Sequence, residues 1–291
     1  MLELLHFSPL IDPTSACQRD KRFVPDGNLP LDSPIPCRVK KPWVGLMASQ
    51  NEGAEQHSQL LFGELFFLLC NKDGWAYGQS VIDGYLGWIP LDAITLTPDE
   101  APNATITQSM AKVFMDPKDS SKLLRELPFA AQVTLVDNLA KNGFIAIESG
   151  GWITAKSVVK LPYSGVTLLD SAESFLNAPY LWGGRTKMGL DCSALVQLSL
   201  AHTGLRVHRD SDLQWASIGV EIDPKIADRG DLVFFPGHVG IMLDSKNVLH
   251  ANQTRKAVTI DPLEDVIDWV KKDLMKKGNN KEPLTGFKRI L

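Results

Sequence analysis

Two neighbouring stretches decide the fold of this chain: PYLWGG at residues 179–184 and GLDCSALVQ at residues 189–197. The first has an aromatic pair followed by two glycines, which is typical of a tight loop whose backbone approaches another group closely. In the second, Asp191 and Ser193 flank Cys192 where an apolar run of helical period begins. Asp or Ser ahead of such a run is a helix-start signal, so the sequence predicts Cys192 at a helix N-terminus.

The position of Cys192 suggests a nucleophile. At a helix N-terminus the macrodipole and the unpaired N–H groups favour a thiolate, so we expect a lowered pKa for this thiol. The alternative is a buried structural cysteine, which is the more common fate of a lone cysteine. Gly183 and Gly184 are expected to leave room for a substrate beside it.

The composition is that of an ordinary globular protein, with 44% hydrophobic and 22% charged residues. A net charge of −4 and a pI near 5.9 give no reason to expect nucleic acid or an anionic membrane as a partner. The four cysteines are scattered without metal-ligand spacing, which argues against a zinc site and a disulfide framework. The N-terminus has no basic region of a signal peptide, and no stretch approaches a membrane span. A cytoplasmic protein is therefore expected, with a periplasmic one as the minor alternative.

The composition and residue pattern of the chain change along its length. Residues 1–40 are rich in proline, which disfavours long helices and central strands and predicts an extended arm. Residues 41–98 and 103–161 contain short apolar runs separated by Gly and Asp turns, typical of two small antiparallel barrels. Residues 165–291 place helices before a run of strands, which predicts an α+β domain with its helices on one side of an antiparallel sheet.

The two barrel segments share a repeat. GWIPLDAI at residues 87–94 is echoed by GWITAKSV at residues 151–158, which indicates one supersecondary unit used twice. Both segments resemble bacterial SH3-like (SH3b) barrels. Periodicity alone would also allow residues 60–69 to form one buried helix, but Gly63 and the neighbouring aromatic residues favour strands.

The last segment carries the remaining expected elements. They are a helix at 167–176, a helix from Cys192, a segment at 213–218, strands at 231–235, 238–243 and 248–251, a lysine-rich helix at 264–277 and a final strand at 286–291. We expect the lysine-rich helix to be a solvated insertion.

A cysteine nucleophile needs a base to accept its proton and a group that orients the base. Among the six histidines, His238 opens an apolar strand and His250 ends the next. The turn at 244–247 predicts a hairpin that places both imidazoles on one face, nearly opposite each other. Each histidine alone is more simply a half-buried sheet residue. Together with Cys192 they predict a line of thiol, imidazole base and second imidazole that fixes the tautomer.

Four motifs, in this order, resemble NlpC-type bacterial cell-wall peptidases: PYLWGG, DCSALV, RGDLVFF and HVGI. The resemblance covers about residues 167–291 and implies a papain-like catalytic domain, here preceded by two SH3-like barrels. It also implies a Cys–His pair with a third polar residue, which are Cys192, His238 and His250 in this chain. The sequence departs from the family pattern at Ala194, usually Gly, and at Arg229, usually Pro.

Family members with two such barrels are γ-D-glutamyl-L-diamino-acid endopeptidases of the dipeptidyl-peptidase VI type, which cleave after γ-D-Glu in peptides with a free L-Ala amine. The resemblance implies a set of substrate-binding residues, which are Asp191, Ser193, Asp210, Ser211, Tyr85, Glu64 and Tyr180. The tyrosine at 180 would help to stabilise the oxyanion, and the acidic residues would hold the ammonium. The alternatives are a helix cap for Asp210 and Ser211, exposed barrel residues for Tyr85 and Glu64, and a core aromatic for Tyr180.

The sequence therefore predicts a cysteine peptidase of peptidoglycan-derived peptides, with a muropeptide as its substrate and no metal or organic cofactor. Three alternatives remain open at this point: a hydrolase of intact peptidoglycan anchored by its barrels, a non-catalytic wall-binding protein, and another acyl chemistry such as an amidase or acyltransferase. The sequence does not distinguish meso-diaminopimelate from lysine on the leaving side.

Overall fold

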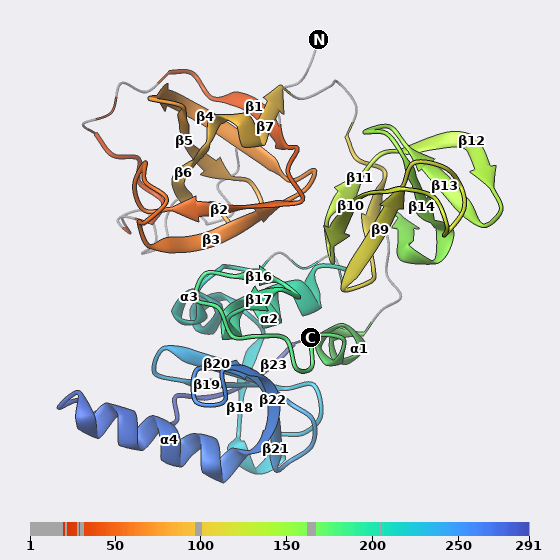
Figure 1. Ribbon diagram of the computed structural model, residues 1–291. Coiled ribbons are helices and arrows are strands. Elements are labelled where there is room, and N and C mark those ends of the chain that lie inside the picture. The colour runs from red at the N-terminus through yellow and green to blue at the C-terminus, as the bar shows by residue number, and fades with distance from the viewer. Residues whose placement is uncertain are drawn as a thin grey trace.

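The computed structural model describes residues 20, 22–27, 29, 32–96, 101–161, 167–203, 205 and 207–290. Figure 1 shows two all-β bodies above a third body that contains the helices α1–α4 and ends the chain. The predicted class, α+β with two small all-β barrels before a mixed domain, is confirmed. Within the described residues, no helix has the length and apolar character needed to cross a bilayer. The linkers at 97–100 and 162–166 lie outside the described residues.

The first barrel is a curled antiparallel sheet with the strand order β3-β2-β6-β5-β4-β1-β7. Its strands are β1 (Ile35–Val39), β2 (Trp43–Met47), β3 (Gln56–Leu61), β4 (Leu65–Lys72), β5 (Trp75–Ser80), β6 (Leu86–Pro90) and β7 (Ile94–Leu96). Residues 60–69 thus form two strands and not a helix, as predicted. Gly63 lies in the turn between them with φ +79°, and a Cβ there would meet Gln132 O of the second barrel at 2.1 Å.

Strand β1 corrects the expectation for the proline-rich arm. It lies inside the sheet between β4 and β7, although the prolines of this region were expected to exclude such a strand. Pro36 pairs with Phe67 of β4, whereas the pairing with β7 begins only at Cys37. The missing N–H therefore costs no ladder hydrogen bond with β7.

The second barrel combines a five-stranded sheet, β10-β9-β14-β13-β12, with a three-stranded one, β11-β8-β15. Its strands are β8 (Ala104–Ile106), β9 (Met110–Phe114), β10 (Leu123–Pro128), β11 (Gln132–Val133), β12 (Leu135–Lys141), β13 (Phe144–Ile147), β14 (Trp152–Thr154) and β15 (Val158–Lys160). The Gly-Trp-Ile repeat has the same structure in both barrels. A strand leads into a 3₁₀ turn (Leu91–Ala93 or Ala155–Ser157) and then into the closing strand β7 or β15.

The C-terminal domain is built on a six-stranded antiparallel sheet, β18-β23-β19-β20-β21-β22. Its strands are β18 (Val220–Ile222), β19 (Leu232–Phe235), β20 (His238–Met242), β21 (Asn247–Asn252), β22 (Ala257–Pro262) and β23 (Gly286–Arg289), and a small hairpin comprises β16 (Arg185–Thr186) and β17 (Gly189–Leu190). Its helices are α1 (Leu168–Glu173), α2 (Cys192–Leu200), α3 (Ser211–Ser217) and α4 (Leu263–Lys276), with a 3₁₀ turn at Pro224–Ile226.

The helices do not all lie on one side of this sheet, which corrects the sequence-based expectation. Helices α1 and α2 pack on the face that carries Phe234, whereas α4 packs on the face that carries Val233 and Phe235. Val266 and Leu274 of α4 are buried, so this helix is part of the fold and not a merely solvated insertion.

Both barrels contribute side chains to the core of the C-terminal domain. Leu61 at the end of β3 and Phe129 after β10 belong to the same buried cluster as α1 and α2. Phe129 meets Phe175 edge to face, with ring centroids 5.4 Å apart. The barrels are therefore packed against the C-terminal domain, as the close approach of all three bodies in Figure 1 illustrates.

Candidate active site

Cys192 is the first residue of α2, as the sequence predicts, and its side chain is buried next to β20. Asp191 occupies the N-cap position, and its carboxylate accepts a hydrogen bond from Ala194 N at 2.9 Å. This cap satisfies one of the four N–H groups that a helix start leaves without an intrahelical partner. The local sequence Asp-Cys-Ser therefore places the thiol at the point where the helix begins.

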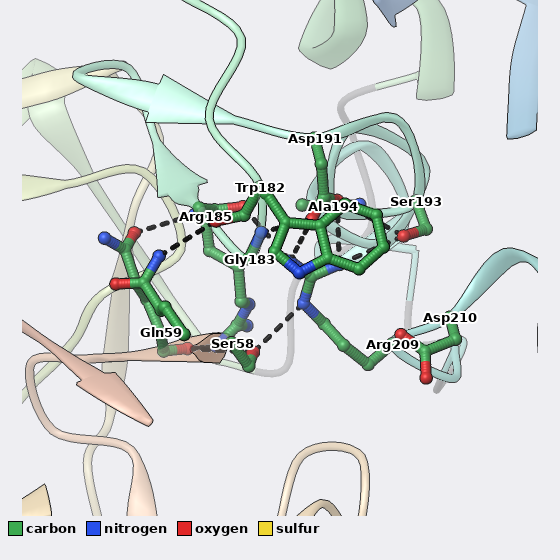
Figure 2. Close-up of polar contacts among 12 residues, drawn as sticks. Ser58, Gln59, Trp182, Gly183, Arg185, Asp191, Ser193, Ala194, Arg209 and Asp210 are labelled. Carbon is green, nitrogen blue, oxygen red and sulfur yellow. Dashed lines mark hydrogen bonds and ion pairs between the residues drawn. The ribbon is translucent and has the colours of Figure 1, made fainter. Parts of the chain in front are cut away.

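Arg209 fixes Asp191 from the loop that precedes α3. Its guanidinium donates to the two carboxylate oxygens at 2.6 and 2.8 Å and to Ser193 Oγ at 3.0 Å. Its Nε donates to Ser58 Oγ of β3, also at 3.0 Å. Figure 2 shows this side chain between the start of α2 and the first barrel. The Arg209–Asp191 pair is buried, and breaking it would leave an uncompensated charge. Because Arg209 also contacts Ser58, it ties the helix that begins at Cys192 to the first barrel.

The carboxylate of Asp191 thus makes its hydrogen bonds within the protein, although the residue borders the cleft beside Cys192. Besides Arg209 and Ala194, it accepts a hydrogen bond from Gly183 N at 2.8 Å. The contacts give Asp191 a positioning role toward the nucleophile. Arg209 was not identified from the sequence, where it is only the residue before the Asp-Ser pair.

The pKa values of Cys192 and His238 differ from those expected for a thiol at a helix N-terminus and its base. Burial and the neighbouring Asp191 carboxylate raise the pKa of Cys192 to about 12. Burial and the nearby His250 lower the pKa of His238 to about 3. The predicted lowering of the thiol pKa is therefore wrong, because desolvation outweighs the macrodipole. The resting pair is a neutral thiol and a neutral imidazole, and the proton must move as the thiol attacks.

His238 and His250 lie on one face of the β20–β21 hairpin. Their Nε2 and Nδ1 atoms are 2.7 Å apart. Since Ile241 pairs with Leu249, the two histidines are diagonal neighbours and not directly opposite residues. Gly240 lies between them in space, and a Cβ there would come within 3.3 Å of His250 Cβ.

Asp261 of β22 continues this line and was not identified from the sequence. Its Oδ2 is 3.3 Å from His250 Nε2. Asn252 Nδ2 approaches the same nitrogen at 3.2 Å but has a second acceptor, Thr259 Oγ1, at 2.8 Å. The charge-assisted bond to the carboxylate is the stronger one, so His250 Nε2 carries the proton. His250 Nδ1 then accepts from His238 Nε2–H, which leaves His238 Nδ1 as the nitrogen that acts as base.

A cleft of about 640 Å³ opens beside Cys192, between the C-terminal domain and the first barrel. Tyr85 of the barrel donates its hydroxyl to Asp210 at 3.0 Å. Burial and the Asp210 charge raise the pKa of Tyr85 above its usual range. Arg22 of the N-terminal arm also donates to Asp210 at 2.8 Å, and to Asp212 at 2.9 Å. The structure thus brings Tyr85 and Asp210 together and adds Arg22, which no motif indicated.

The alternative of a helix cap is excluded for the Asp210 side chain. Asp210 occupies the N-cap position of α3 but makes no side-chain cap bond, because its carboxylate points to Arg22 and Tyr85. Ser211 and Ser193 line the same cleft.

Tyr180 lies in a second cavity, together with His238 and His250. Burial, followed by the proximity of Cys192 and Asp191, raises the pKa of its hydroxyl. The hydroxyl is therefore a proton donor at neutral pH, near the nucleophile. Such a donor suits the oxyanion role that the family resemblance implies.

Glu64 is placed differently from the expectation that it binds substrate. Its carboxylate is buried and pairs with Arg185 through two hydrogen bonds of 2.9 and 3.0 Å. It also accepts from Leu61 N at 2.9 Å. Arg185 further donates to Gln59 O at 2.6 Å. Because these contacts satisfy the carboxylate, Glu64 joins the barrel to the β16–β17 hairpin and does not line the cleft.

The two glycines of PYLWGG also have a different role from the one expected. A Cβ on Gly183, which has φ +71°, would lie 2.4 Å from Gln56 O of the first barrel. A Cβ on Gly184 would lie 2.3 Å from Gly189 O. The glycines therefore permit backbone contacts with the barrel and the hairpin, and they do not leave space for substrate.

Three further cleft residues were not identified as site residues from the sequence. Glu55 accepts a hydrogen bond from Trp182 Nε1 at 3.1 Å. His57 packs against Tyr85 with ring centroids 5.7 Å apart. Trp182 belongs to the PYLWGG motif, whereas nothing in the sequence singles out Glu55. Across the described part of the chain, His, Cys, Asp and Glu side chains form no group of three or more that could hold a metal ion.

Comparison with known proteins agrees with this geometry. The sequence profile of the NlpC/P60 family matches residues 177–276, and that of the bacterial dipeptidyl-peptidase Sh3 domain matches residues 46–94. The probable endopeptidase NlpC of Escherichia coli is 37% identical over 112 residues, which are 36% of this chain and 71% of that protein. The chain belongs to the NlpC/P60 family.

Other NlpC/P60 relatives match over more of the chain. The gamma-D-glutamyl-L-lysine dipeptidyl-peptidase of Bacillus cereus is 26% identical, covering 71% of this chain and 70% of the relative. Dipeptidyl-peptidase 6 of Lysinibacillus sphaericus is also 26% identical, covering 79% of this chain and 92% of the relative. A crystal structure of an NlpC/P60 family protein from Bacillus cereus has a TM-score of 0.72 at 18% identity, covering 88% of this chain and 99% of that one. That likeness establishes a shared fold.

Proposed function

We propose that this NlpC/P60 cysteine peptidase hydrolyses the bond between γ-D-Glu and a diamino acid in short peptidoglycan-derived peptides with a free N-terminal L-Ala. The observation that carries the proposal is the hydrogen-bonded His238–His250 pair, together with a buried cysteine at a helix start that borders an acidic cleft. The names of the Bacillus cereus and Lysinibacillus sphaericus relatives support the same bond.

The charge of the cleft supports a substrate with an ammonium group. Glu55, Asp210 and Asp212 line it, and Arg22 is the cation nearest to them. A cleft with more carboxylates than cations attracts an amine and can hold it through charge-assisted hydrogen bonds. The first barrel covers this side through Tyr85, so a long glycan strand would not fit beyond the L-Ala residue. This supports short peptides as substrates over intact peptidoglycan.

The reaction begins with attack of Cys192 Sγ on the γ-carbonyl carbon of D-Glu. His238 Nδ1 takes the thiol proton as the S–C bond forms, because both groups are neutral in the resting enzyme. The negative charge that develops on the carbonyl oxygen can be stabilised by the Cys192 N–H at the helix start and by the Tyr180 hydroxyl. The imidazolium on His238 is stabilised by His250, which in turn is held by Asp261.

The tetrahedral intermediate then collapses. The C–N bond breaks, and the leaving amine of the diamino acid takes the proton from His238. Water attacks the thioester with His238 as base, which releases L-Ala-γ-D-Glu and returns the proton to Cys192. The net reaction is the hydrolysis of one amide bond by one water molecule, and it returns Cys192 and His238 to their starting states.

The test is hydrolysis of L-Ala-γ-D-Glu-meso-diaminopimelate followed by mass spectrometry. We expect Cys192→Ala to abolish cleavage, and Cys37→Ala to retain it as a control that removes a buried thiol from the first barrel. Acetylation of the L-Ala amine should lower kcat/KM about 10- to 100-fold, since it removes a charged hydrogen-bond donor.

Each outcome bears on a different part of the proposal. Cleavage by the Cys192→Ala variant would overturn the assigned nucleophile. Equal rates with free and acetylated peptides, or release of peptides from intact sacculi at comparable rates, would overturn the assignment of short, free-amine substrates.

A further inference from the structure

A second cavity, of about 460 Å³, adjoins the acidic cleft on the histidine side of the site. His238, His250 and Tyr180 line one wall, and helix α4 forms the other. Gly237 borders both this cavity and the cleft beside Cys192, so the two spaces meet at the catalytic pair. The site is thus a groove with the nucleophile and its base at the middle.

The direction of the substrate in this groove follows from the chemistry. The scissile bond must lie between the Cys192 thiol and the His238 imidazole, because one attacks the carbonyl and the other protonates the leaving amine. The acyl part, with its L-Ala ammonium, belongs to the acidic cleft. This step rests on the proposed function. The leaving diamino acid therefore extends into the cavity under α4.

The wall formed by α4 offers an apolar surface followed by two opposite charges. Trp269 and Val270 line the cavity. Trp269 stacks on His250, with ring centroids 6.4 Å apart and 9° between the ring planes. Asp273 follows one turn later in α4, and Lys277 directly follows the helix as its C-cap residue. The two side chains form an ion pair of 2.7 Å. Their side chains are 57% and 68% exposed, so both charges are accessible to a ligand.

We propose that this face of α4 is the subsite for the leaving residue, and that it selects a diamino acid whose far end carries both an ammonium and a carboxylate. In such a residue, of which meso-diaminopimelate is the example, the methylene chain would pass over Trp269 and Val270. Its far ammonium would meet Asp273, and its far carboxylate would meet Lys277. The far end of a lysine side chain carries only the ammonium, so a lysine substrate would leave Lys277 without a ligand partner.

The test compares L-Ala-γ-D-Glu-meso-diaminopimelate with L-Ala-γ-D-Glu-L-lysine in the full-length enzyme. We expect the native enzyme to prefer the diaminopimelate peptide. Lys277→Gln should lower kcat/KM for that peptide about 5-fold, as for an exposed charge pair, and leave the lysine peptide within twofold. Lys276→Gln is the matched control, since it makes the same charge change on the adjacent residue, which is exposed and does not line the cavity.

The outcomes separate this inference from the proposed function. An active enzyme whose preference is unchanged by Lys277→Gln, or is changed equally by Lys276→Gln, would overturn the subsite alone. A native enzyme that cleaves neither peptide would overturn the proposed function and the subsite with it. A selective loss on the diaminopimelate peptide in the Lys277→Gln variant supports both.

Discussion

Replacing Asp261 by asparagine tests how the histidine pair is oriented. The substitution keeps the size of the side chain but removes its charge and offers an amide N–H₂ in place of a carboxylate oxygen. His250 Nε2 then loses its charged acceptor at 3.3 Å. The amide can instead donate to that nitrogen, which would shift the proton to His250 Nδ1. His238 Nε2 would then have to accept, and Nδ1 would carry the proton that it should be free to receive.

The size of the effect can be worked from the geometry. With an effective dielectric constant of about 20, a carboxylate 3.3 Å from a charged His250 contributes about 5 kcal/mol. For a positive charge on His238, one imidazole further away at roughly 8 Å, the same relation gives about 2 kcal/mol. Because the catalytic charge develops on His238, we expect kcat to fall at least about 30-fold. KM should stay within about twofold, since Asp261 does not line either cavity.

The pH profile provides a readout that a purely structural role would not change. Removing the negative charge makes the imidazolium less stable, so the pKa of His238 falls. The acid limb of kcat/KM should therefore move to lower pH than in the native enzyme, where the depressed pKa of His238 already places it well below pH 6.5. The charged residues around the histidines are Asp261, which pairs with Arg255, and Asp273 and Lys277, which line the adjoining cavity. Only the first is changed in this experiment.

The assay measures release of L-Ala-γ-D-Glu from the tripeptide across a range of pH, with thermal unfolding measured in parallel. Asp231→Asn is the matched control, because Asp231 is also a buried carboxylate of this domain and pairs with Arg289 at 2.7 Å outside the site. We expect the control to lose stability but to keep its pH profile. A kcat within threefold of the native value and an unmoved acid limb in the Asp261→Asn variant would refute the tautomer argument.

Three further predictions concern the pair, the barrel contact and the arm. Burial and His250 lower the pKa of His238 to about 3, so the base stays unprotonated well below pH 6.5. We therefore expect kcat/KM to stay constant as the pH falls below 6.5, which assays over a series of pH values will check. Glu64→Gln leaves Arg185 buried without its charge partner and should cost about 3–5 kcal/mol in urea unfolding, with KM unchanged; a raised KM at full stability would contradict this. Arg22→Gln should free the cleft carboxylates and lower KM for the free-amine peptide about threefold, but not for its acetylated form.

The part of the site that could be predicted from the sequence is local. Cys192 follows an N-cap residue and begins an apolar helix, and those signals lie within a few residues of each other. His238 and His250 were found because one short turn joins their strands. In each case the geometry depends on a short stretch of chain and on regular backbone.

The parts that were missed depend on contacts between distant segments. Asp261 reaches His250 only through the register of β21 with β22, in which His250 pairs with Thr259. The family resemblance implied a substrate contact for Glu64, and no local pattern points to its actual partner, Arg185, which lies 121 residues further along the chain. The pKa of Cys192 was expected in the wrong direction because a sequence shows the helix start but not the burial that opposes it.

The sharing of Leu61 and Phe129 with the peptidase core has a consequence for how substrate selection can change. The barrel strand that ends in Leu61 also carries Ser58, which contacts Arg209, and the same barrel provides Tyr85 to the cleft. Deleting the barrel to admit larger substrates would remove a core side chain and a partner of a buried arginine. Short-peptide selectivity is therefore coupled to folding, and a variant that accepts longer chains has to be sought in point changes around Tyr85.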